Sequence, residues 1–135
     1  MTDQLYLSLY RCFTFLFFPF SKPVIKWRIK RGKEHAIRWR EKLGEPSVER
    51  PSGKLIWLHA VGLGEVLALR GLILELHKKD RNLNFLVTSS TVFSAEVFEK
   101  NCPQKTIHQF LPYDVKIYGN RFLRHWEPDL LIWSE

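Results

Sequence analysis

Residues 54–65, KLIWLHAVGLGE, form the stretch that decides the fold. Its first half, Leu55 to Leu58, is entirely apolar, which is typical of a strand buried on both faces of a parallel sheet. The residues from Glu65 to Lys79 are apolar at helical spacing instead. A strand that stops at a glycine turn and continues as a helix predicts one βα unit. Glu65 then follows the carboxyl end of the strand, at the edge where open α/β sheets bind ligands.

The same alternation repeats after Pro51-Ser52-Gly53. The pattern predicts strands at 55–59, 84–89, 106–111 and 129–133, and helices at 65–79, 92–101 and 115–126. Right-handed crossovers between such strands give one parallel sheet with helices on its faces. We therefore predict an α/β, Rossmann-like domain over residues 51–135, preceded by a separate N-terminal segment over residues 1–50.

The glycine turn does not match a phosphate-binding fingerprint. Gly62 and Gly64 supply the first two glycines of G-x-G-x-x-G, but Leu67 stands at the third position. No Lys-Ser/Thr pair follows, as a P-loop requires. Glu65 therefore keeps two interpretations at this point. It is either a first-turn acid that interacts favourably with the helix dipole or a catalytic base.

Polar side chains gather at the predicted carboxyl ends of all four strands. They are Glu65, Thr88 to Ser90, Tyr113, Asp114, Ser134 and Glu135. Several also have local interpretations: Ser89 or Ser90 can cap the next helix, and Asp114 can be an N-cap. Tyr113 can equally belong to the core. His59, at the end of the first strand, is predicted either to stabilise the turn by a hydrogen bond or to contact a substrate.

The net charge of +7 lies entirely in the first 54 residues, which hold 12 Lys/Arg and 5 Asp/Glu, while residues 55–135 hold 9 of each. Nine of these basic residues lie between Lys22 and Lys42, interleaved with Trp27 and Trp39. Such a stretch can bind nucleic acid by phosphate neutralisation and stacking, or it can be a solvated helix packed on the domain. The strongly apolar stretch beside it favours a membrane surface instead, and we predict no nucleic-acid partner.

That apolar stretch runs from Leu5 to Phe20 and is interrupted by Arg11. Pro19 and Pro23 are expected to close it. Its longest charge-free run falls well short of the roughly 20 residues needed to cross a bilayer. A secretory signal fits poorly, because Asp3 stands where a basic cluster is expected and no small-residue cleavage site follows. We predict an amphipathic N-terminal helix on an anionic membrane surface, at the cytoplasmic face.

The cysteine content excludes two further classes of site. Cys12 and Cys102 are the only cysteines, so the sequence contains no disulfide framework and no closely spaced metal-ligand pair. This usage indicates a reducing compartment.

Four stretches, in this order, resemble the Kdo transferases, which add 3-deoxy-D-manno-octulosonic acid to lipid A precursor in lipopolysaccharide biosynthesis. They are LGEP at Leu43 to Pro46, IWLHAVGLGE at Ile56 to Glu65, FLPYD at Phe110 to Asp114, and PDLLIWSE at Pro128 to Glu135. The resemblance covers nearly the whole chain but only the amino-terminal half of a GT-B glycosyltransferase. The chain departs from the family at Gly62, where a serine is usual, and at STVFSA, residues 90–95, which lacks a Pro-Thr-Gly character.

The resemblance implies a chemistry for two residues. Glu65 is expected to be the proton acceptor and Glu135 to stabilise the transition state of an inverting transferase. The donor, CMP-Kdo, carries its own leaving group, and the resemblance implies no metal ion and no cofactor. The expected location is the inner membrane, with the lipid A precursor as acceptor.

The family's donor-binding domain lies beyond the resemblance. We therefore expect CMP-Kdo to require a C-terminal domain that this sequence lacks, and the chain alone to be inactive. The alternative is a non-catalytic α/β module at the membrane surface, either a remnant of such an enzyme or one subunit of a split enzyme.

Overall fold

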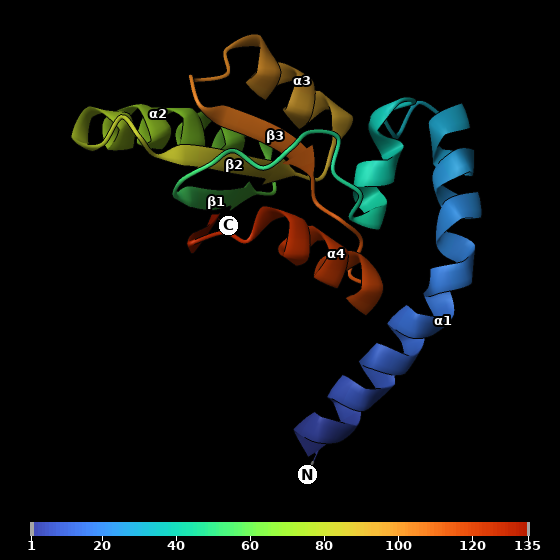
Figure 1. Cartoon of the computed structure of the whole chain (residues 1–135). Helices are drawn as coiled ribbons and strands as arrows, with labels where there is room; N and C mark the ends of the chain where they lie inside the picture. The colour runs from blue at the N-terminus through green and yellow to red at the C-terminus, as the bar shows by residue number, and fades with distance from the viewer. Residues whose placement is uncertain (1, 135) are drawn as a thin grey trace.

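A computed structural model describes residues 2–134, and within them the predicted alternation of strands and helices is confirmed (Figure 1). Each strand and helix of that alternation lies within two residues of its expected bounds. In chain order the elements are α1 (Thr2–Lys30), the 3-10 helix η1 (Arg38–Leu43), β1 (Leu55–Ala60), α2 (Leu63–Lys79), β2 (Asn84–Ser89), α3 (Val92–Lys100), β3 (Thr106–Phe110), α4 (Lys116–Trp126) and β4 (Leu130–Ser134).

The four strands form one parallel sheet in the order β3-β2-β1-β4. The chain moves outward from β1 to β3 and then returns to the other side of β1 for β4. This reversal is the topological switch point of a doubly wound sheet, where the loops on the two sides diverge and leave room for a ligand. In the register of the sheet Ala60 lies opposite Ser134, so β1 and β4 end side by side at the carboxyl edge.

Helices cover the two faces of the sheet as separate layers. On one face α2 and α3 pack against Leu58 of β1 and Val87 of β2. On the other face α4 packs against the sheet through Phe122 and Trp126, which contact Trp57. Every residue of β1 and β2 is buried, which explains why these strands are continuous apolar runs rather than alternating ones.

The N-terminal helix is longer than expected, because α1 continues through Pro19 and Pro23 to Lys30. Each proline removes one helical N–H donor, and the ribbon changes direction between the two halves of α1 (Figure 1). The second half is held by packing: Ile25 is fully buried against Leu43 and Tyr118. Tertiary contacts thus carry the helix past two residues that would end it in isolation.

The 3-10 helix η1 was not expected within the basic stretch. It lies over the end of β3, where the Phe110 N–H donates to Glu41 Oε2 at 2.8 Å. β3 is an edge strand, and a partner for its backbone donors protects that edge from pairing with another chain. Residues 1–50 are therefore in contact with the sheet, while their division as a separate domain stays a prediction.

Gly44 ends η1 in a left-handed conformation, with φ at +74°. A Cβ at this position would collide with the Tyr118 carbonyl of α4. Gly32 has a similar φ of +68°, but nothing lies within 4 Å of the Cβ that it would carry. Both glycines have a positive φ, but only Gly44 lies close to another element. Comparing alanine at the two positions therefore separates the free-energy cost of the backbone conformation from that of the steric collision with α4.

We expect Gly32→Ala to lower the free energy of unfolding by about 1 kcal/mol, the cost of alanine at positive φ. Gly44→Ala should cost at least about 2 kcal/mol more, because α4 must also move away from η1. Urea unfolding followed by circular dichroism measures both. Equal losses in the two variants would show that η1 does not pack this closely against α4.

Candidate functional site

Glu65 is the third residue of α2 and lies half-buried at the helix N-terminus, just beyond the carboxyl end of β1. Its side chain folds back over Gly62, where an added Cβ would collide with Glu65 Oε2. Within residues 2–134 the carboxylate takes part in no hydrogen bond or ion pair. Glycine at position 62 thus leaves the space that the carboxylate occupies. The helix dipole favours a negative charge here without using either oxygen.

β4 ends at the same edge, one residue before the second predicted catalytic position in the sequence. Ser134, its last residue, is the register partner of Ala60. Glu135 itself lies outside the described residues, so its predicted role stays a prediction. Glu65 lies five residues after Ala60 and therefore follows the sheet at the switch point between β1 and β4.

His59, the last residue but one of β1, is buried with its ring against Trp133 of β4, at 4.1 Å between ring centroids. Its Nδ1 is 2.8 Å from Thr88 Oγ1, and the Trp57 indole N–H donates to the same oxygen at 2.8 Å. This hydrogen bond runs across the sheet to β2. The two predicted roles of His59, a hydrogen bond that stabilises the turn or a contact with substrate, stay predictions. The contacts of His59 thus join β1 to both β2 and β4, next to the turn that carries Glu65.

The predicted caps at the other strand ends are wrong by one residue or more. Thr91 caps α3, because its hydroxyl accepts the Ser94 N–H at 3.1 Å. Ser89 instead lies in the sheet, where its Oγ is 2.8 Å from His108 Nε2. Val115 is the N-cap residue of α4, without a side-chain bond, and Asp114 accepts a hydrogen bond from the Tyr10 hydroxyl of α1. α3 begins at Val92, as predicted, so the residue before it is Thr91, whereas α4 begins at Lys116, one residue later than predicted.

A buried polar network beside β3 was missed by sequence reasoning. The Arg38 guanidinium donates to both Glu41 oxygens, at 2.8 and 2.9 Å, and to the His108 carbonyl at 2.8 Å. Burial, with Arg38 and Lys42 nearby, lowers the pKa of His108 to about 3. The imidazole is therefore neutral near neutral pH and serves the network as a hydrogen-bonding group. Charged residues in a basic stretch carried no signal of burial.

Lys42 connects the N-terminal segment to the carboxyl edge of the sheet. Its ammonium group is buried and donates to the Ser90 carbonyl, which follows β2, at 2.8 Å. Burial lowers the pKa of Lys42, with the Glu34 carboxylate acting in the opposite direction. Glu34 in turn accepts from Arg28 of α1 at 2.8 Å. The end of α1 is thereby fixed relative to the site.

Tyr113 completes this side of the edge and is half-buried rather than part of the deep core. Its backbone N–H donates to the Lys42 carbonyl at 2.9 Å, and its hydroxyl is 3.5 Å from Glu34 Oε1. Burial, with Glu34 adjacent, raises the pKa of Tyr113 to about 12. It is thus a neutral hydroxyl donor. Among residues 2–134 no cluster of three His, Cys, Asp or Glu side chains is arranged to hold a metal ion.

Comparison with known proteins gives a consistent family. The family model described as 3-deoxy-D-manno-octulosonic-acid transferase (kdotransferase) matches residues 37–135. A probable mitochondrial 3-deoxy-D-manno-octulosonic acid transferase of Arabidopsis thaliana is 42% identical over 127 residues, which cover 94% of this chain and 28% of the relative. The 3-deoxy-D-manno-octulosonic acid transferase of Rickettsia bellii is 34% identical over 129 residues, covering 96% of this chain and 31% of the relative.

A more distant relative extends the same family. The 3-deoxy-D-manno-octulosonic acid transferase of Haemophilus influenzae is 29% identical over 92 residues, or 68% of this chain and 21% of the relative. The chain therefore spans less than a third of the length of these three proteins. No solved structure matches it.

Proposed function

This chain belongs to the family of 3-deoxy-D-manno-octulosonic acid (Kdo) transferases, and we propose that it forms the acceptor-binding half of a GT-B enzyme. That enzyme transfers Kdo from CMP-Kdo to a lipid A precursor. The observation that carries the proposal is the position of Glu65 at the switch point of the sheet, where its carboxylate takes part in no hydrogen bond or ion pair with the described residues 2–134. A catalytic base needs an oxygen that is free to accept a proton from the substrate, whereas a capping side chain uses its oxygen to accept a backbone N–H.

The reaction requires one proton transfer and one displacement. The acceptor hydroxyl loses its proton to Glu65 while its oxygen forms a bond to the anomeric carbon of Kdo. The bond from that carbon to the cytidylate phosphate breaks, and the phosphate leaves with the electron pair. The transition state resembles an oxocarbenium ion, and we propose that Glu135 stabilises its positive charge. The adjacency of β1 and β4 supports this pairing of the two glutamates.

A fusion enzyme tests the proposed activity. It consists of this chain followed by the part of the Rickettsia bellii relative that lies beyond the matching segment. We expect the fusion to transfer Kdo from CMP-Kdo to lipid A precursor, measured with radiolabelled acceptor. A fusion that unfolds cooperatively and binds CMP-Kdo but transfers no sugar would favour the alternative, a non-catalytic α/β module at the membrane surface.

The exposed apolar surface of α1 supports a location at the membrane. Leu9, Phe13 and Leu16 are 58%, 70% and 64% exposed, and they lie on one side of the helix with Leu5 and Phe20. Among the described helices none is both long enough and apolar enough to span a bilayer. We propose that α1 lies in the interface of the inner membrane at its cytoplasmic face, with the following basic residues near anionic headgroups.

Changing Leu9, Phe13 and Leu16 together to serine should weaken binding to anionic vesicles by about 100-fold or more, because each buried side chain contributes about 1.5 kcal/mol or more. Co-sedimentation with vesicles measures the change. Salt should weaken wild-type binding without abolishing it. Substitutions are preferable to deletion of residues 1–42, which would remove Ile25 and Lys42 from the folded domain.

A matched control carries serine at Leu72, Leu74 and Phe93, which are exposed on α2 and α3. This variant loses comparable apolar surface on the opposite side of the sheet and should bind vesicles as the wild type does. If the two triple variants lost binding equally, α1 would not be the membrane contact.

A further inference from the structure

A groove of about 630 Å³ runs along the outer face of α4. Its lining residues are Pro46, Ile117, Asn120, Arg121, Arg124 and His125. None of these residues belongs to the turn that carries Glu65, and the proposed transfer reaction makes no use of the groove.

The groove is strongly cationic. α4 carries Lys116, Arg121, Arg124 and His125 and contains no acidic residue. Arg124 is exposed and, within residues 2–134, takes part in no hydrogen bond or ion pair. Arg121 uses one nitrogen to donate to the Leu43 carbonyl at 2.9 Å and to reach Glu45 at 3.4 Å. Its remaining N–H groups stay available, so the two arginines present several donors to an anion.

α4 and α1 face the same side of the molecule. α4 covers the sheet face opposite α2 and α3, and the N-terminal half of α1 extends past α4 on that side (Figure 1). Two hydrogen bonds fix this arrangement, from the Tyr10 hydroxyl to Asp114 and between Ser21 and the Tyr118 hydroxyl. The ring of Phe18 also packs near the ring of Tyr118, with 5.6 Å between the ring centroids. The helix that carries the groove and the N-terminal half of α1 are therefore neighbours.

We propose that this groove binds the phosphate of an anionic phospholipid headgroup, which makes α4 a second membrane contact. The proposal rests on the membrane association of α1 proposed above. A guanidinium can donate two parallel hydrogen bonds to a phosphate, and Arg121 and Arg124 lie within one helical turn of each other. Ile117, which lines the groove one helical turn before Arg121, is 42% exposed and can contact the acyl boundary of the bilayer.

Arg124→Glu tests the groove. Each charge near an anionic membrane changes binding by about fivefold, so this change of two charges should weaken binding to vesicles containing phosphatidylglycerol by about 25-fold. Binding to vesicles of phosphatidylcholine alone should not change. Arg124→Lys should retain most of the binding, and thermal melting should show that both variants are folded.

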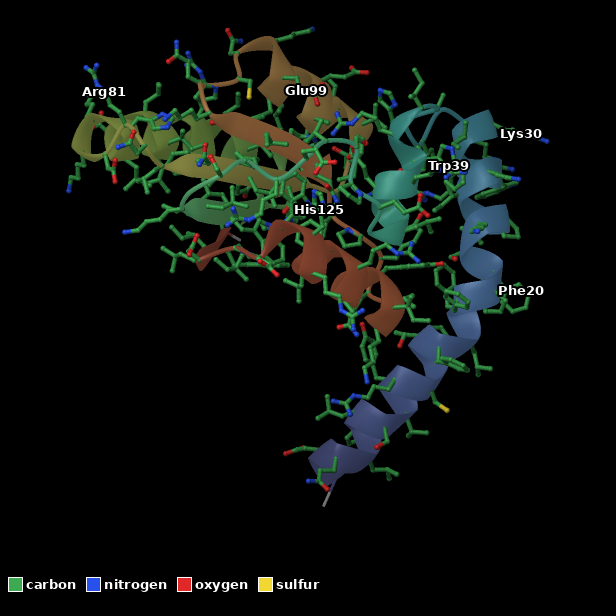
Figure 2. The ribbon with its side chains drawn as sticks, viewed as in Figure 1. Phe20, Lys30, Trp39, Arg81, Glu99 and His125 are labelled. Atoms are coloured by element: carbon green, nitrogen blue, oxygen red, sulfur yellow. The ribbon has the colours of Figure 1, made fainter. Side chains whose placement is uncertain are left out.

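Arg81→Glu is the matched control. Arg81 is also exposed, has no ion pair or hydrogen bond within the described part of the chain, and lies at the end of the molecule away from α1 (Figure 2). It should weaken binding by less than about twofold. If Arg124→Glu and Arg81→Glu weakened vesicle binding equally, the effect would depend only on net charge and the proposal would be overturned. Unchanged vesicle binding by Arg124→Glu would also overturn it.

Two further outcomes have distinct meanings. Competition of wild-type binding by inorganic phosphate, but not by sulfate at the same ionic strength, would identify a free-phosphate site and overturn the lipid assignment. If wild-type protein bound no vesicles at all, the proposed membrane location of α1 would fail together with the groove. If the α1 variants lose binding and Arg124→Glu does not, only the groove proposal fails.

Discussion

Glu65→Gln in the fusion enzyme should lower the turnover of Kdo transfer by about 100-fold or more, because the amide cannot accept the proton of the attacking hydroxyl. The free energy of unfolding should change by less than about 1 kcal/mol, the usual contribution of an acid at a helix N-terminus. Initial rates with saturating CMP-Kdo, together with thermal melting, separate the two effects.

Glu75→Gln is the matched control for this substitution. Glu75 lies on the same helix, is exposed, and pairs only with Lys78 at 2.6 Å in the described part of the chain. Its loss should leave turnover unchanged. Comparable turnover in the Glu65 and Glu75 variants would return Glu65 to the role of a first-turn acid, and the base would have to be sought elsewhere at the same edge.

Arg38→Gln should lower the free energy of unfolding by about 3 to 5 kcal/mol, because it leaves the buried Glu41 carboxylate without its ionic partner. Glu41 is 1% exposed; it pairs with Arg38 within η1 and accepts hydrogen bonds from the Ser47 hydroxyl and the Phe110 N–H. The loss is a large part of the stability of a small domain. Urea unfolding followed by circular dichroism measures it.

Arg40→Gln provides the comparison within the same short helix. The Arg40 side chain is 67% exposed and reaches Glu45 only at 3.4 Å. Its loss should change the free energy of unfolding by less than about 0.5 kcal/mol. Similar losses in the two variants would mean that Glu41 is solvated in solution and that η1 does not seal the edge of β3.

The sheet could be predicted from the sequence because its strands are buried on both faces. A short run such as Leu55 to Leu58, bounded by glycines, is typical of a fully buried strand, and the glycine turn after it places the next helix. The order β3-β2-β1-β4 required the structure, since four parallel strands with right-handed crossovers can be arranged in more than one order. That order makes β1 and β4 neighbours.

The N-terminal segment shows where local patterns fail. Pro19 and Pro23 are helix breakers by themselves, but packing of Ile25 on Leu43 and Tyr118 holds α1 together across them. Arg38 and Lys42 belong to a stretch that resembles a solvated basic helix, and their burial depends on partners far along the chain, His108 and Ser90. Long-range pairs of this kind have no periodicity that a single sequence reveals.

At the candidate site the position of Glu65 was predicted and its surroundings were not. The sequence places the glutamate after a strand and a turn, whereas the contact of its carboxylate with Gly62 depends on a side-chain rotamer. The cap at Thr91 was missed although α3 begins at Val92 as predicted, because residues 89–91 all carry hydroxyl groups and the pattern does not show which of them accepts the Ser94 N–H. The start of α4 was placed one residue too early.

The most direct test of the central claim is to locate the acceptor on the chain. Isotope-labelled protein in detergent micelles is titrated with lipid A precursor, and backbone amide shifts are compared with those in micelles alone. We predict that the shifts concentrate at Val61 to Glu65 and at Ser134, where β1 and β4 end side by side. Shifts confined to the opposite edge, at Asn84 and Thr106, or no shifts beyond those of the micelle, would contradict an acceptor site at the carboxyl edge of this sheet.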